Sequence, residues 1–80
     1  MDKQMIELIA IGASAAVNCR PCMEHHSELG RKLGVSREQL RAAVEVGMKV
    51  NQGAANKTAH YVAELFGEER QSMQTKGCCG

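Results

Sequence analysis

Two cysteines and a histidine are closely spaced in the first third of the chain. Cys19 and Cys22 form a C-x-x-C pair, and His26 follows Cys22 by four residues. Residues four apart on a helix lie on the same face, so we expect the His26 ring close enough to exchange a proton with a thiol. Cys19 lies at the expected start of that helix, where unpaired backbone N–H groups favour a thiolate. This spacing indicates redox chemistry.

A carboxylate partner for the imidazole is available in Glu7, twelve residues before Cys19. Periodicity does not decide its role, because Glu7 falls on a narrow polar stripe of its helix, where a solvated glutamate is an equal alternative. A group that transfers protons matters, because a more acidic thiol is also a weaker nucleophile. Lowering the thiol pKa alone therefore raises the reactivity of the thiol only about threefold. His25 and His60 are interpreted as surface residues.

The same residues allow two other hypotheses. Cys19, Cys22 and His26, together with Cys78 or Cys79 from the end of the chain, supply enough ligands for a zinc or metalloid site. Metal binding is the weaker prediction, because three of these ligands lie on one helix and no second ordered pair accompanies them. In the other hypothesis, His26 is a core histidine and the chain is a non-catalytic helical interaction domain.

The composition narrows the class of protein. The 80 residues suffice for one domain, and ten basic against nine acidic side chains give a net charge of +1, which provides no electrostatic basis for binding nucleic acid or an anionic membrane. No apolar run reaches the roughly 20 residues that span a bilayer. A signal peptide begins with a basic segment that is followed by an apolar one, and the acidic residues Asp2 and Glu7 interrupt that pattern here. We therefore predict a cytoplasmic protein. No cofactor is predicted.

The sequence predicts an all-α fold of about four helices. Pro21 is tolerated in a first helical turn, Ser36 begins a capping box, and Gly34 and Gly53 are placed to end or bend helices. The predicted helices cover residues 3–17, 21–33, 37–51 and 54–66. Residues 1–67 would thus form one compact domain. Residues 68–80 have no periodic apolar face and predict a flexible tail ending in the vicinal pair Cys78-Cys79.

The first predicted helix is apolar around well over half of its circumference. Such a helix must be buried on more than one side, and a chain this short buries only about 60% of the surface of its unfolded form. A second subunit is the simplest cover, so we predict a homo-oligomer formed through this helix.

The spacing of these residues resembles a known signature. Glu7, Cys19-x-x-Cys22 and His26 are similar to the motif of the alkylhydroperoxidase D-like (AhpD-like) branch of the carboxymuconolactone decarboxylase family, and the resemblance covers about residues 4–66. It implies an all-α domain that assembles into dimers or hexamers, with the thiol pair near subunit contacts.

By the same resemblance, Glu7 and His26 would relay a proton from Cys22. Cys22 would be the thiol that attacks a peroxide, and Cys19 the thiol that resolves the sulfenic acid as a disulfide. The implied function is a thiol peroxidase or disulfide reductase, with a peroxide or disulfide as substrate and an external dithiol or redox protein as electron donor. Decarboxylases of this superfamily lack the thiol pair, so lactone decarboxylation is not predicted.

Overall fold

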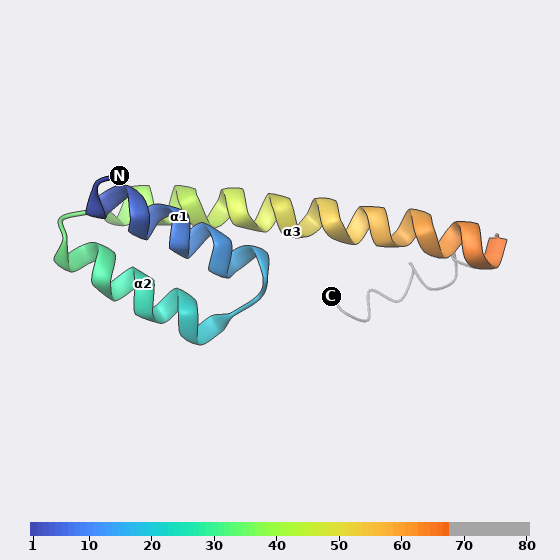
Figure 1. Cartoon of the computed structure of the whole chain (residues 1–80), viewed down its shortest axis with the longest axis horizontal. Coiled ribbons are helices and arrows are strands. Elements are labelled where there is room, and N and C mark those ends of the chain that lie inside the picture. Colours follow the sequence, from blue (N-terminus) through green and yellow to red (C-terminus); the bar gives the residue numbers. More distant parts are fainter. Residues whose placement is uncertain (68–80) are drawn as a thin grey trace.

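A computed structural model describes residues 1–67 of the chain, which form three helices (Figure 1). Helix α1 spans Lys3–Ala16, α2 spans Arg20–Lys32 and α3 spans Arg37–Phe66. The described residues contain no strand, so the predicted all-α fold is confirmed. The ends of α1 and α2 lie within one residue of those predicted. The predicted tail with Cys78 and Cys79 lies outside the described residues.

The prediction of four helices is wrong for the described chain. The segments expected as separate helices, 37–51 and 54–66, are one continuous helix α3 that runs through Gly53. A glycine inside a helix costs only about 1 kcal/mol relative to alanine. No proline accompanies Gly53 to remove a hydrogen bond, so the helix continues through it.

Side-chain caps fix where α1 and α3 begin. The Asp2 carboxylate accepts a hydrogen bond from the Met5 backbone N–H at 2.7 Å. Before α3, the Ser36 hydroxyl accepts from the Gln39 N–H, and the Gln39 side chain accepts in return from the Ser36 N–H, both at 3.0 Å. This is the predicted capping box, which satisfies two N–H groups that the helix leaves free.

Helices α1 and α2 end in the same backbone motif. After α2, the Gly34 N–H donates to the Arg31 carbonyl and the Val35 N–H donates to the Gly30 carbonyl at 2.9 Å. Gly34 has a φ of 93°, a left-handed conformation that glycine adopts without steric cost. This pair of hydrogen bonds is a Schellman motif, and it turns the buried Val35 side chain back into the core.

The core is small, and α1 lies at its centre. Helix α1 packs along both α2 and α3, whereas α2 and α3 contact each other little (Figure 1). Ile11, Val35 and Leu40 form the buried cluster. Gly12 and Gly47 bring α1 and α3 close together: a Cβ atom at Gly47 would lie 2.9 Å from the Gly12 carbonyl carbon. These contacts hold the α1 face that bears Glu7 in a fixed position.

Much of the apolar surface of α1 and α3 remains exposed within the single chain. Ile9 of α1 is 53% exposed, and no side chain among the described residues is completely buried. The C-terminal half of α3 extends past the end of α1 and has no neighbouring helix in the described chain (Figure 1). None of the three helices is long and apolar enough to cross a membrane.

Candidate active site

The two cysteines of the C-x-x-C pair are joined by a disulfide bond. Their Cα atoms lie 5.3 Å apart, which is within the range that a disulfide bridges. Both residues are half-buried, so the pair is held by the fold and still accessible from solvent. The structure thus brings the two predicted redox thiols together in the oxidised state.

Cys19 is held by the turn that connects α1 and α2. Asn18 has a φ of 60°, a left-handed conformation that asparagine tolerates better than most residues. The Cys19 N–H donates to the Ser14 carbonyl at 2.9 Å, and the Asn18 N–H donates to the Ala15 carbonyl at 3.2 Å. This second Schellman motif makes Cys19 both the residue that closes α1 and the N-cap of α2.

The beginning of α2 places both sulfurs at a positive helix end. Cys19 is the N-cap of α2, and its side chain makes no capping hydrogen bond, while Cys22 lies in the first helical turn. The unpaired backbone N–H groups and the aligned peptide dipoles at such an end stabilise negative charge. In the reduced protein, this environment favours the thiolate form that reacts with electrophiles.

Glu7 and His26 form a hydrogen-bonded pair between α1 and α2. The distance from His26 Nδ1 to Glu7 Oε1 is 2.6 Å. Glu7 is only 7% exposed, and the side chain of His26 is 27% exposed. An ionised carboxylate only accepts hydrogen bonds, so Nδ1–H donates to it, and Nε2 is the nitrogen left for a second proton. The alternative of a solvated glutamate is therefore wrong.

Gly30, one turn after His26, is buried beside this pair. A Cβ atom at Gly30 would lie 3.7 Å from the Glu7 Cβ and 3.0 Å from Leu40 Cδ2. The 3.7 Å approach to Glu7 is ordinary van der Waals contact, so the tight constraint at Gly30 comes from the Leu40 side chain of α3. The sequence pattern alone did not indicate this contact.

His26 follows Cys22 by one turn of α2, so the two side chains lie on the same side of the helix. Within residues 1–67, no hydrogen bond joins the imidazole to either sulfur of the disulfide. A disulfide carries no proton to share, and the proposed exchange applies to the reduced thiol. The geometry therefore contains a thiol pair, an imidazole one turn away and a buried carboxylate that orients the imidazole.

Other residues considered from the sequence lie apart from this group. His25 and His60 are exposed, as predicted. Within residues 1–67, no three His, Cys, Asp or Glu side chains are grouped as metal ligands. The ligand set of the metal-binding hypothesis includes Cys78 or Cys79, which lie outside the described residues.

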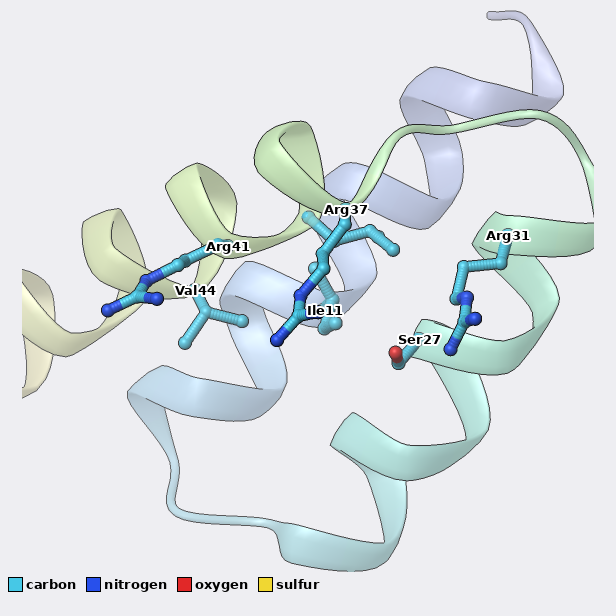
Figure 2. A pocket seen from close by; sticks show the side chains of 7 residues that line it. Ile11, Ser27, Arg31, Arg37, Arg41 and Val44 are labelled. Carbon is cyan, nitrogen blue, oxygen red and sulfur yellow. The ribbon is translucent and has the colours of Figure 1, made fainter.

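A hollow of about 450 Å³ between α2 and α3 is lined by Arg31, Arg37 and Arg41 above an apolar floor that includes Ile11 (Figure 2). Sequence reasoning did not single out these arginines. Arg31 lies roughly half a turn around α2 from Cys22, so this hollow opens on a different side of the helix from the disulfide. Arg41 is paired with Glu45 at 3.3 Å. We assign the hollow no part in the redox site.

Comparison with known proteins defines the family. Residues 1–64 match the model of the carboxymuconolactone decarboxylase family. The chain belongs to the carboxymuconolactone decarboxylase family. The chain is 37% identical over 54 residues to a protein of Hyphomonas neptunium named alkyl hydroperoxide reductase AhpD, and the match covers 68% of this chain and 30% of that protein. The family resemblance inferred from the signature residues is thereby confirmed.

A second relative, from Paracoccus denitrificans, is named uncharacterized protein 4 in cox locus. It is 29% identical over 68 residues, which cover 85% of this chain and 61% of that protein. The chain thus spans about a third of the first relative and under two thirds of the second. No solved structure matches the chain significantly.

Proposed function

We propose that this member of the carboxymuconolactone decarboxylase family is a thiol peroxidase that cycles Cys19 and Cys22 between dithiol and disulfide. The observation that carries the proposal is the Glu7–His26 hydrogen bond of 2.6 Å next to a disulfide-bonded C-x-x-C pair. The name of the Hyphomonas relative, an alkyl hydroperoxide reductase, supports a peroxide as the oxidant. An isolated structural disulfide would not need a buried carboxylate–imidazole pair beside it.

The proposed first step consumes the peroxide. His26 accepts the proton of the Cys22 thiol at Nε2, and Glu7 stabilises the resulting imidazolium through Nδ1–H. The Cys22 thiolate attacks the terminal oxygen of the peroxide ROOH, so that the S–O bond forms and the O–O bond breaks. The leaving alkoxide takes the proton from His26 and departs as the alcohol ROH. Cys22 is then a sulfenic acid.

The proposed second step regenerates the enzyme. The Cys19 sulfur attacks the Cys22 sulfenic acid, the S–S bond forms and the S–O bond breaks, and the hydroxyl group leaves as water with the proton of the Cys19 thiol. An external dithiol then reduces the disulfide by two thiol–disulfide exchanges and is itself oxidised to a disulfide. The net reaction converts a peroxide and a dithiol into an alcohol, water and a disulfide. The need for a reduced dithiol agrees with function in the cytoplasm, where thiols are kept reduced.

The direct test is consumption of hydrogen peroxide or an alkyl hydroperoxide with dithiothreitol as electron donor. We expect turnover by the wild type and none by Cys22→Ser. A Cys78→Ser/Cys79→Ser variant is the matched control, because it removes two thiols but leaves the proposed centre intact. Absence of turnover with every peroxide tested would contradict the peroxidase proposal.

A disulfide reductase is the second candidate, because a C-x-x-C pair that forms a disulfide is also suited to exchange with other disulfides. The same preparations separate the two functions. A peroxidase forms its disulfide when the reduced protein meets a peroxide, whereas a reductase forms it only when a disulfide substrate is added.

A further inference from the structure

The hollow between α2 and α3 follows from the way the three helices pack. Helix α1 packs along both other helices, whereas α2 and α3 contact each other little, so a gap remains over one face of α1. Ile11 and Leu40, which are 3% and 5% exposed, lie at its floor, and the half-buried Val44 extends this floor along α3. The volume of about 450 Å³ is within the range of pockets that hold small molecules.

The walls of this hollow carry positive charge. Three of the five arginines of the chain line it, and none of its lining residues in the described chain is acidic, so the charge is concentrated here although the whole chain carries only +1. In Figure 2, Arg31 points along α2 toward Ser27, and Arg37 extends into the gap from α3. Arg41 points away from them, toward the later turns of α3, and is paired with Glu45.

The charges of Arg31 and Arg37 are not neutralised by a carboxylate of the described chain. Within residues 1–67, neither makes a salt bridge, since the ion pairs there involve other residues. Two guanidinium groups that face one hollow repel each other, and an anion between them would replace this repulsion by two attractions. The planar guanidinium presents two parallel N–H donors that match the two oxygens of a carboxylate. These two walls are therefore suited to a carboxylate.

Ser27 adds a hydroxyl donor to the hollow. Hydroxyl groups inside helices commonly donate to the carbonyl four residues earlier, as Ser14 does to Ala10 at 2.7 Å and Thr58 to Ala54 at 3.1 Å. Ser27 is half-buried and lines the hollow, but its hydroxyl makes no such hydrogen bond within residues 1–67. This hydroxyl is thus available to a ligand that lies between the two helices.

We propose that the hollow binds a small carboxylate with an aliphatic tail, of the class of medium-chain fatty acids. The carboxylate lies between Arg31 and Arg37 and accepts a hydrogen bond from Ser27, and the tail covers Ile11 and Val44. An inorganic anion would leave this apolar floor in contact with water, and a neutral apolar molecule would dehydrate the guanidinium groups without pairing them. The hollow opens on a different side of α2 from the disulfide, so the proposal does not rest on the peroxidase function.

The first experiment is calorimetric titration of the full chain with octanoate, at low salt and below the concentration at which octanoate forms micelles. We expect one molecule bound per chain, at least about tenfold more tightly than acetate, which lacks the tail, and than octan-1-ol, which lacks the charge. Absence of octanoate binding would overturn the proposal. Equal affinity for acetate would contradict the role of the floor, and equal affinity for octan-1-ol would contradict the role of the arginines.

The second experiment tests the two arginines separately. Arg31→Gln and Arg37→Gln should each weaken octanoate binding by about five- to tenfold, because each removes one charge-assisted contact at a site partly open to water. Lys32→Gln is the matched control, since Lys32 follows Arg31 on α2 and carries the same charge but does not line the hollow. It should change the affinity by less than about twofold. Equal effects of Arg31→Gln and Lys32→Gln would show that only net charge matters and would contradict a defined site.

A third measurement locates the ligand in the unsubstituted protein and does not depend on how the variants fold. Octanoate should shift the backbone amide resonances of Ser27, Arg37 and Leu40 more than those of Val46 and Gly47. The last two residues line an apolar groove between α1 and α3, where an aliphatic tail alone would bind. Larger shifts at Val46 and Gly47 would place the ligand in that groove and overturn the proposal.

Discussion

The buried hydrogen bond between Glu7 and His26 makes Glu7→Gln the most informative substitution. Glutamine has nearly the same shape, so the side chain still fits between α1 and α2, but it carries no charge. Glu7 is 7% exposed, and its Oε1 lies 2.6 Å from His26 Nδ1. The perturbation therefore removes the group that would stabilise a positive charge on the imidazole and leaves the packing of the site almost unchanged.

The size of the effect follows from the strength of such bonds. Hydrogen bonds to charged groups contribute about 1.5–3 kcal/mol. If this contribution is lost only when His26 holds the proton of the Cys22 thiol, the rate of thiol oxidation falls by about 10- to 150-fold. Reduced protein is mixed with peroxide, and formation of the Cys19–Cys22 disulfide is followed by quenching and mass spectrometry. This single-turnover assay requires no electron donor.

Glu45→Gln is the matched control, because Glu45 is also a glutamate on a helix but its side chain is 60% exposed and paired with Arg41. Its oxidation rate should stay within about twofold of the wild type. Circular dichroism should show that both variants remain helical. If a folded Glu7→Gln protein forms the disulfide as fast as the wild type, Glu7 takes no part in proton transfer and the relay is refuted.

Three further predictions concern the elements that position the site, and chemical denaturation measures each of them. Gly47→Ala should destabilise the fold by about 1–3 kcal/mol, because the new Cβ meets the Gly12 carbonyl. An unchanged denaturation midpoint would show that α1 and α3 separate easily. Asn51→Ala should cost about 1 kcal/mol through loss of the hydrogen bond to the Ala16 carbonyl, and Gln52→Ala, an exposed neighbour, should cost less. Ser36→Ala should cost about 1 kcal/mol by removing the cap of α3, and no loss would indicate that water replaces the hydroxyl.

Local signals in the sequence were sufficient to predict most helix ends. The boundaries of α1 and α2, and the start of α3, follow from caps and turn residues that act within a few positions of one another. Ser36 with Gln39 and the turn at Gly34 behave as predicted. The break expected at Gly53 is absent, because a single glycine penalty is smaller than the cost of ending a helix that nothing forces to turn back.

The site could be predicted only in part, because its two halves come from different helices. The spacing of Cys22 and His26 lies on one helix and follows from helical periodicity. The burial of Glu7 does not, because periodicity assigns it to a polar stripe and cannot show that α2 covers that stripe. Only the packing of α1 against α2, with Gly30 at the contact, turns a polar surface residue into the partner of His26.

The central claim is that Cys22 is the thiol that attacks a peroxide. Its most direct test is to trap the sulfenic acid with dimedone in a Cys19→Ser variant, which lacks the thiol that would resolve it. We predict about one peroxide-dependent adduct per chain, and mass spectrometry should locate it on Cys22. A Cys22→Ser protein should form no adduct at position 22. A Cys19→Ser protein that is folded and exposed to peroxide but forms no adduct on Cys22 would contradict the claim.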